Sequence, residues 1–418
     1  MLDRIHLFVP FKPEHVQLLG AEGKNDPDHL VPLELLMQHG VPVSGQVSRD
    51  ESGNLQADDL RHCWESLSTG FTPMAFKIFH QSMGKRLMPG IELKASPAKL
   101  LQGHNVFGPT SIALGAMEMW RWLGSAYPEL ASMLNLEQAE VYDIDCTYSS
   151  RLPDERTCLQ AIEAIRGVSN GQTKGRGDDY QTTAYFGAKD SRLRRLKLYL
   201  KQPEFERQLE DAKRARRGDM AAARTVRVMS DPRLQAWARC LLRIEATVAK
   251  RWLNRRGIPN KLVDLVRYQE EFPVQHDGKC FIQWCWEEVT RELFAAFEGM
   301  TMRVVDDETV LTALKNKHGR VGKNGKTSHT VALGLFRTYR MIKDYGWHET
   351  MDSMSRATFY RHIQAITECG LSKAFLQKLQ ERDRKSNVIP LLRFLDVDFG
   401  AQRPDWYVEP GHVLVRAA

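Results

Sequence analysis

The sequence lacks the features of exported and membrane proteins. No stretch reaches the roughly 18 uncharged apolar residues that a membrane span needs. The first residues, MLDRIHLFVPFKPEH, have neither the apolar core nor the small-residue cleavage site of a secretory signal. The seven cysteines are odd in number and scattered, without a CxxC pair, which disfavours a disulfide framework and a zinc site. We therefore expect no membrane association and a cytoplasmic, reducing location.

The bulk composition indicates a globular protein of more than one domain. Apolar residues make up 42% and charged residues 27% of the 418 positions, and a chain of this length usually forms two or three domains. The net charge of +7, from 59 basic and 52 acidic residues, leans only mildly toward a polyanionic partner.

The hydrophobic pattern divides the chain into a mixed part and a helical part. Alternation with period two predicts strands at 4–10, 75–80, 90–95, 141–148, 182–187, 193–201 and 241–248. Helical patterns cover 110–127, 154–166 and 203–217, and after about residue 250 they cover 260–272, 284–299, 308–317, 332–345, 355–369 and 372–382. We therefore predict an α+β fold with an antiparallel sheet at 1–250, a helical connection at 251–299 and a mostly helical C-terminal domain at 300–418.

One face of the predicted sheet gathers charge. Three strands each carry polar side chains at alternate positions and apolar ones between them. The polar sets are Asp143, Asp145 and Thr147; Arg195, Lys197, Tyr199 and Lys201; and Arg243, Glu245 and Thr247. The apolar set of the first strand is Tyr142, Ile144, Cys146 and Tyr148. An antiparallel sheet with one solvated face shows the same alternation, so periodicity alone leaves both interpretations open.

The mixture of residue types favours phosphodiester chemistry on this face. Such chemistry needs a nucleophile, cations for the phosphate and often a hard divalent metal, and carboxylates suit Mg²⁺ or Mn²⁺. Tyrosine ionises near pH 10, and we expect the flanking Lys197 and Lys201 to favour the phenolate of Tyr199.

Ordered motifs along the chain resemble one family closely. They include AFKIF at 75–79, ELKASPAK at 92–99, LQGHNVFG at 101–108, VSNGQTK at 168–174, RIEA at 243–246 and VDFGAQRPDWYVEP at 397–410. The sequence resembles the gene II replication initiators of filamentous phages over nearly its whole length. The resemblance implies a sheet fold like that of the HUH rolling-circle initiators and an enzyme that nicks one strand of the origin. It also implies a tyrosyl–DNA 5′-phosphate link and later joining of the displaced strand.

The resemblance also implies partners and products. We expect the protein to act in the host cytoplasm on phage origin DNA, both double-stranded and displaced, as a homo-oligomer. Host helicase, polymerase and single-strand-binding protein are expected to work with it. A shorter product from an internal start at Met300 or Met302 is expected as well.

A more distant likeness to plasmid rolling-circle initiators assigns the catalytic residues. In GAKDSRLRRLKLYLKQPE, residues 187–204, Tyr199 takes the position of the nucleophile and Glu204 matches a trailing glutamate. Lys197 replaces an arginine, which keeps the charge but loses the bidentate fork. None of the 13 histidines forms the His-hydrophobe-His metal pair of those relatives. Asp143 and Asp145 have the same spacing, Asp145 is the family's usual position, and Glu245 is the second expected ligand.

Other residues have a functional and a structural interpretation. His104 and Asn105 lie in a Gly-flanked turn, where they either fix the turn or contact metal or phosphate. Glu92 and Lys94 share a strand face and either border the site or form a surface ion pair. Tyr407 indicates a packed tail anchor. The expected DNA contacts, which could equally be solvated loops and helix faces, are Lys174, Arg176, Arg195, Lys213, Arg214, Arg216, Arg217, Arg243, Lys250 and Arg251.

Two rival functions stay open. A DNA-binding replication regulator would not cleave, and a metal-dependent hydrolytic endonuclease would cleave with water and form no covalent adduct.

Overall fold

The computed structural model divides the chain into two compact units. Unit 1 is Met1–Leu293 with Asp396–Ala418, and unit 2 is Phe294–Leu395. The structure describes residues 1–19, 28–41, 46–49, 55–59, 63–82, 88–166, 169–170, 173–174, 182–186, 191–215, 218–298, 307–321, 327–369, 371, 373–377, 379 and 397–410. Within these ranges, no helix combines the length and the apolar composition needed to cross a membrane.

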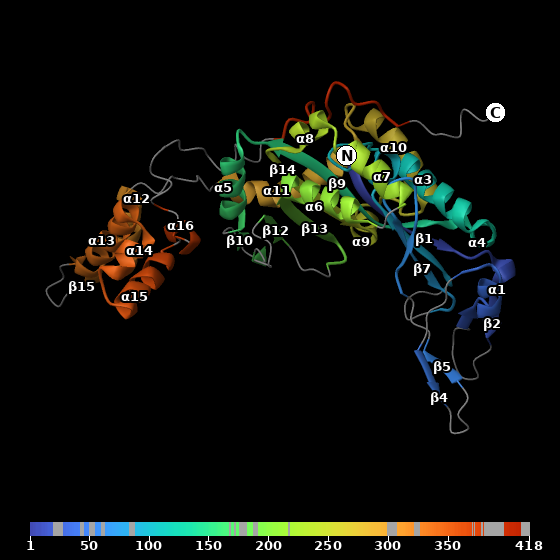
Figure 1. Cartoon of the computed structure of the whole chain (residues 1–418), viewed down its shortest axis with the longest axis horizontal. Helices are drawn as coiled ribbons and strands as arrows, with labels where there is room; N and C mark the ends of the chain where they lie inside the picture. The colour runs from blue at the N-terminus through green and yellow to red at the C-terminus, as the bar shows by residue number, and fades with distance from the viewer. Residues whose placement is uncertain are drawn as a thin grey trace. The chain divides into compact units, whose positions relative to one another are not determined.

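Unit 1 is built on one eight-stranded antiparallel sheet (Figure 1). Its strands, in spatial order, are β12 (Thr183–Phe186), β13 (Arg194–Leu200), β14 (Leu241–Ala249), β9 (Glu140–Arg151), β1 (Leu2–Pro10), β8 (Gly90–Ala95), β7 (Met74–Phe79) and β6 (Glu65–Leu67). All seven predicted strands are therefore confirmed within a few residues, and so is the α+β class.

Helices cover the apolar face of this sheet. They include α3 (Ile112–Ala126), α5 (Glu155–Arg166) and α11 (Phe281–Glu298). Gly115 of α3 lies against Ile5 of β1, and the Trp286 indole of α11 donates a hydrogen bond to the Ile244 carbonyl at 2.9 Å. Burying each such aliphatic or aromatic side chain contributes roughly 1.5–3 kcal/mol. The packing of these helices on the apolar side chains of the strands thus determines which face of the sheet is left polar.

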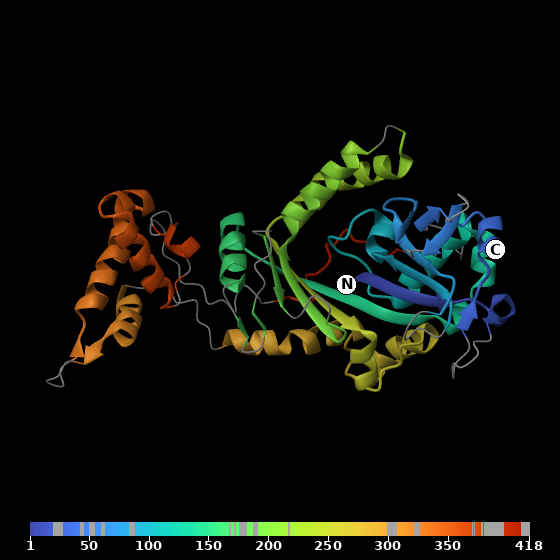
Figure 2. The same ribbon diagram turned by 90° about the horizontal axis from the view of Figure 1, so that it is seen from below.

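A second, smaller core lies at one end of the polar face. It joins α6 (Lys201–Arg214), α7 (Met220–Met229) and α8 (Pro232–Ala238) to the turn after α2 (Pro97–Gln102). Phe205 and Leu209 of α6 pack there on Val106 and Phe107. Figure 2 shows α6 and α7, in light green, on the opposite side of the sheet from α11, in gold. Helix α6 begins at Lys201, two residues before the predicted start.

The remaining short elements of unit 1 were mostly not predicted. The helices are α1 (Leu33–Gln38), α4 (Pro128–Met133), α9 (Lys250–Arg255) and α10 (Leu262–Gln275), with 3-10 turns at Pro13–His15 and Leu136–Gln138. The two-stranded pairs are β2 (Gln17–Leu19) with β3 (Asp28–Leu30), β4 (Gln46–Arg49) with β5 (Leu55–Asp59), and β10 (Ser169–Asn170) with β11 (Thr173–Lys174). Of this set, only α10 was expected from the sequence.

Two irregularities in the pairing of β1 with β9 change which side chains reach the polar face. The register shifts between Leu2 and Arg4 and again between His6 and Leu7. A bulge sets two residues of one strand against one of its partner and re-aims the extra side chain. The first shift brings Asp3 to the polar face, where it contacts Asn105 and Ser96.

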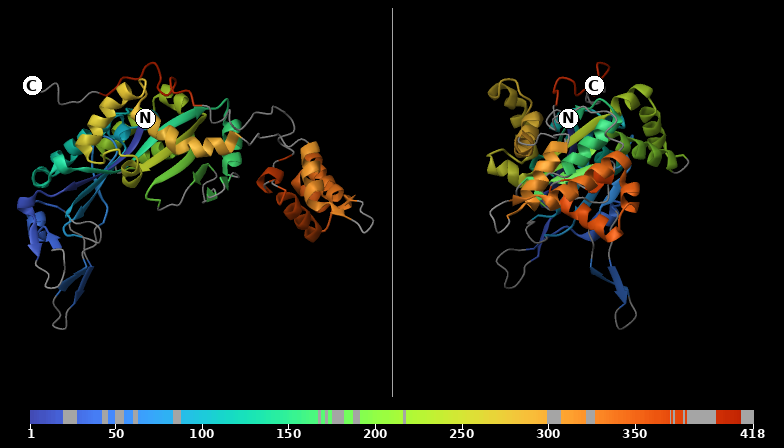
Figure 3. Two further views of the ribbon diagram at one scale, coloured as in Figure 1. Left: turned by 180° about the vertical axis from the view of Figure 1, so that it is seen from behind. Right: turned by 90° about the vertical axis from the view of Figure 1, so that its left-hand side faces the viewer.

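Unit 2 is helical, as predicted (Figure 3). Its elements are α12 (Asp307–His318), β15 (Arg320–Val321), β16 (Thr327–Ser328), α13 (Thr330–Tyr345), α14 (Trp347–Asp352), α15 (Arg356–Thr367) and α16 (Lys373–Gln377). Leu314, Tyr339, Phe359 and Ile363 form part of its own core.

The observed division differs from the expected one at the C-terminal end of the chain. Residues 397–410, here called the C-terminal strap, pack on unit 1 rather than within the helical unit. The Gln402 side chain bridges the backbone of Ser149 in β9, accepting from its N–H at 2.8 Å and donating to its C=O at 2.9 Å. The expected boundary near residue 299 lies outside the described residues.

Candidate active site

The polar side chains of β13, β14 and β9 share one face, as the sequence predicted. Lys197 lies opposite Glu245, Tyr199 opposite Arg243, and Thr247 opposite Asp145. Directly opposed residues of an antiparallel pair point to the same side of the sheet. Residues that are about 100 positions apart in the chain therefore meet in one cluster.

Strand β1 adds two cations that the sequence analysis missed. Arg4 bridges two carboxylates, with its guanidinium 2.7 Å from Asp143 Oδ1 and 2.9 Å from Asp145 Oδ2. His6 Nδ1 lies 3.1 Å from Asp143 Oδ2, and its Nε2 lies 3.3 Å from Glu92 Oε2. Burial lowers the pKa of His6, but the hydrogen bonds with Asp143 and Glu92 outweigh it and raise the pKa overall. Arg4 and His6 alternate along a predicted strand, so the same parity argument could have found them.

The three expected metal ligands occupy different environments. Burial and the neighbouring Asp145 raise the pKa of Glu245 to about 8. Burial also raises the pKa of Asp145, against the charge of Arg4 and a 2.6 Å hydrogen bond from Thr247 Oγ1. For Asp143, burial acts in the same direction, but His6 and Arg4 outweigh it and lower the pKa. Asp145 and Glu245, here called the carboxylate pair, thus form an incompletely compensated site of like charge.

The carboxylate pair offers a divalent cation two protein ligands rather than a complete coordination shell. Mg²⁺ usually keeps several waters and binds through one or two carboxylates together with substrate phosphates, so two ligands are sufficient for it. No group of three His, Cys, Asp or Glu side chains in the described parts of the chain could hold a metal ion. Both aspartates pair with Arg4, but His6 and Arg4 lower the pKa of Asp143 whereas the pKa of Asp145 is raised, so we assign Asp145 as the ligand of the two.

Tyr199 lies in β13 with its side chain almost enclosed, at 4% exposure. Burial raises its pKa well above the ordinary value, even though the charge of Arg243 acts in the opposite direction. Burial therefore dominates the pKa of Tyr199, and the expected support of the phenolate by Lys197 and Lys201 stays a prediction. Lys197 Nζ lies over the ring, 4.3 Å from its centroid, whereas Lys201 points to other partners.

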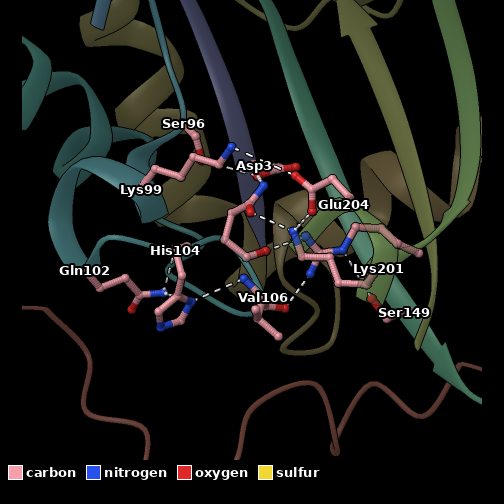
Figure 4. Close-up of polar contacts among 11 residues, drawn as sticks. Asp3, Ser96, Lys99, Gln102, His104, Val106, Ser149, Lys201 and Glu204 are labelled. Carbon is pink, nitrogen blue, oxygen red and sulfur yellow. Dashed lines mark hydrogen bonds and ion pairs between the residues drawn. The ribbon is translucent and has the colours of Figure 1, made fainter. Parts of the chain in front are cut away.

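Lys201 belongs to a buried network that spans four segments (Figure 4). Its ammonium group is fully enclosed, donates to Asn105 Oδ1 at 2.7 Å and pairs with Glu204. Asn105 Nδ2 in turn donates to Asp3 Oδ1 at 2.8 Å. Burial lowers the pKa of Lys201 to about 7, against the favourable charge of Glu204. Asp3, Asn105, Lys201, Glu204 and Arg243 are here called the buried network.

Arg243 is a structural member of this network rather than an exposed DNA contact. It is 1% exposed, and its guanidinium donates to the backbone carbonyls of Asn105 and Val106. The expectation that it contacts the DNA backbone is corrected on this ground. His104 fixes the same turn, because its Nδ1 accepts from the Val106 N–H at 3.3 Å. Burial and the charges of Lys201 and Arg243 lower the pKa of His104 to about 3, which favours the structural interpretation over a charged contact with phosphate.

The C-terminal strap closes over the same turn. Phe107 packs edge-on against Trp406 and Tyr407, with ring centroids 5.2 Å and 5.4 Å away. The prediction of Tyr407 as a packed anchor is thereby confirmed. A cavity of about 360 Å³ remains between the strap and the sheet, lined in part by Arg243, Thr147 and Arg403.

The other expected DNA contacts are placed unevenly. Arg214 and Arg251 are exposed, Lys213 pairs with Glu210 at 2.8 Å, and Lys250 pairs with Glu140 at 2.7 Å. Arg195 lies on the polar face opposite Thr247. Arg176, Arg216 and Arg217 and the side chain of Lys174 lie outside the described residues.

Tyr142 lies on the polar face, and its predicted place on the apolar face is wrong. The register shift at His6 and Leu7 re-aims it. Its ring stacks on Phe8 with centroids 5.5 Å apart and meets His6 edge-on at 5.4 Å.

Comparisons with known proteins identify the family. The family model for the N-terminal part of the phage replication-associated protein matches residues 1–274, and the model for its C-terminal part matches residues 322–413. The chain is 37% identical to the replication-associated protein of Salmonella phage IKe over 424 residues, covering 100% of this chain and 98% of the relative. It is 38% identical to the protein of the same name from Enterobacteria phage f1, covering 98% and 99%. No solved structure matches. The chain therefore belongs to the gene II replication-associated protein family of filamentous phages.

Proposed function

We propose that the protein initiates rolling-circle replication by nicking one strand of the phage origin with Tyr199 and later rejoining the displaced strand. The observation that carries the proposal is the cross-strand register. It sets the single tyrosine of β13 beside Arg243 and Lys197 and diagonally across from Glu245 of the carboxylate pair. A nucleophile, cations and carboxylates are the groups that phosphodiester transfer uses.

The reaction balances without an external energy source. The Tyr199 phenol oxygen bonds to phosphorus as the P–O3′ bond breaks. The phenol loses its proton, and O3′ takes one up to become a free 3′-OH. The phosphodiester energy stays in the tyrosyl–DNA ester, so the reverse attack by a 3′-OH rejoins the strand.

Two cations prepare the buried phenol for this step. The guanidinium of Arg243 lowers the pKa of Tyr199, against the burial that raises it. Lys197 lies over the ring and is only half-buried, so it is able to meet an incoming phosphate.

A divalent cation, Mg²⁺ or Mn²⁺, is part of the proposal. Asp145 and Glu245 would hold it, because a cation relieves the repulsion that raises the pKa of Glu245. When bound, it would supply Lewis-acid polarisation of the scissile phosphate. The partners of the proposal remain origin DNA, host replication proteins and a second copy of the chain.

The experiment is a nicking assay on supercoiled plasmid carrying the phage origin, with Mg²⁺. We expect wild-type protein to give nicked plasmid and a protease-sensitive 5′ adduct. Tyr199→Phe should lose both by at least about a thousandfold, because the only change is the attacking oxygen. Tyr185→Phe, on the neighbouring strand β12, is the matched control and should keep activity.

Other outcomes favour the rival functions. Nicking that survives in Tyr199→Phe without any adduct would indicate a hydrolytic nuclease. Specific binding without nicking by the wild type would indicate a replication regulator.

A further inference from the structure

An aromatic row continues from the carboxylate side of the polar face toward the sheet edge. It consists of Tyr142 on β9, His6 and Phe8 on β1, and Trp64 just before β6. Trp64 reaches back over the sheet, so that its ring lies 5.9 Å from that of His6. His6 of this row is hydrogen-bonded to Asp143, so the row adjoins the proposed nicking site.

The row differs from a hydrophobic core in exposure and in charge. Trp64 is 41% exposed and Tyr142 is half-buried, whereas His6 and Phe8 lie beneath them at 9% and 6% exposure. The rings of Trp64 and Tyr142 therefore pack on the buried rings of His6 and Phe8 and keep part of their own surface exposed to solvent.

Cations accompany both outer rings. Lys94 Nζ lies 4.2 Å from the centroid of the Trp64 ring, and Lys250 Nζ lies 5.7 Å from that of Tyr142. Aromatic rings interleaved with lysines are the pattern by which proteins bind single-stranded nucleic acid, with bases stacking on rings and cations following the backbone.

The position of Tyr199 makes a single strand the fitting ligand. Its phenol is almost enclosed within the sheet face, so a phosphate has to come close to the sheet to be attacked. A strand freed from its duplex partner can do this and can also expose its bases for stacking. From β13 to β1 there are three strand spacings, or roughly 14 Å, which a few nucleotides span.

We propose that Trp64 and Tyr142, supported by His6 and Phe8, form a stacking platform for the bases of the strand that carries the scissile phosphate. The inference rests on the proposed nicking function but concerns binding alone. It assigns Trp64 and Tyr142 to single-stranded DNA, a ligand that their exposure and their cations fit.

The test separates stacking from charge. Anisotropy is measured in EDTA, on the intact Tyr199→Phe chain, with a labelled thymidine oligonucleotide and an abasic oligomer of equal length and phosphate number. Trp64→Ala and Tyr142→Ala are each expected to weaken thymidine binding about tenfold and to change abasic binding less than about twofold. Trp64→Phe should restore most of the loss, because it keeps a ring.

The control is Trp120→Ala, a half-buried tryptophan on helix α3, which should bind both oligomers as the parent does. Equal losses on both oligomers, or no loss for Trp64→Ala, would overturn the proposal. A Trp64→Phe chain that folds and binds as poorly as Trp64→Ala would also overturn it. Because nothing is cleaved in this assay, its result is independent of whether Tyr199 is the nucleophile.

Discussion

Two groups of charges on the same sheet face differ in how fully they are satisfied. In the buried network, Lys201 is paired with Glu204 and Asn105, and Arg243 donates to two backbone carbonyls. In the carboxylate pair, Glu245 keeps a pKa of about 8 because burial and Asp145 both disfavour its charge. A network of paired buried groups specifies a structure, whereas two neighbouring carboxylates that are only partly compensated indicate a place for a ligand. We therefore assign the first mainly to architecture, although Arg243 also faces the Tyr199 phenol, and the second to chemistry.

The substitution with the largest expected effect on stability is one that breaks the buried network. Lys201→Met leaves the largely buried Glu204 carboxylate with only the more distant ammonium group of Lys99, 4.0 Å away, which costs about 3 kcal/mol of folding free energy. Lys197→Met, at a half-buried position on β13, should cost less than about 1 kcal/mol and yet reduce nicking. Urea denaturation and the nicking assay measure the two effects. Equal stability losses in both variants would contradict a structural role for Lys201 and a functional role for Lys197.

The lowered pKa of Lys201 leads to a prediction of how folding stability depends on pH. Its folded-state pKa of about 7 lies below the ordinary 10.5, so between these values the unfolded chain binds a proton that the folded chain does not. Folding stability should therefore rise with pH from 7 toward 10.5, and Lys201→Met should flatten this rise. Urea denaturation at a series of pH values measures it, and a parallel rise in the variant would contradict the assignment.

A prediction of intermediate size concerns the binding of a divalent cation to the carboxylate pair. A cation must displace the proton of Glu245, so Mn²⁺ affinity should fall about tenfold for each pH unit below 8. Titration calorimetry measures this, and Glu245→Gln should both weaken binding and remove the pH dependence. Asp145→Asn should weaken binding as well, whereas Asp143→Asn, at a carboxylate held by Arg4 and His6, should change it less. Equal losses at all three positions would restore Asp143 as a ligand.

The smallest effect concerns the exposed cations outside both groups. Arg214→Ala and Arg251→Ala should each lower the slope of log affinity against log salt by about 0.9 on duplex DNA. Arg233→Ala is the control, because that exposed arginine is already paired with Asp231 at 2.9 Å. Unchanged slopes would leave the two arginines as solvated side chains.

Period-two alternation was sufficient to predict the central strands and the face that Asp145, Tyr199 and Glu245 share. The bulges between β1 and β9 were not predictable, because a one-residue shift in register between two strands leaves the hydrophobic pattern of each strand unchanged. They place Asp3 and Tyr142, which the alternation had left out or put on the wrong face.

Burial of polar groups was equally hidden. Arg243 alternates like an exposed arginine, and only the fold of the 103–109 turn shows that its guanidinium is enclosed. The strap is a similar case, because the hydrogen bonds of Gln402 to Ser149 join residues 253 positions apart.

The most direct test of the central claim is to locate the DNA on the protein. Wild-type protein is allowed to nick labelled origin DNA, the adduct is digested with nuclease and protease, and the modified peptide is identified by mass spectrometry. We expect a nucleotide phosphate on Tyr199, within the peptide of strand β13. A phosphate on another tyrosine, or nicking that leaves no modified peptide, would contradict it.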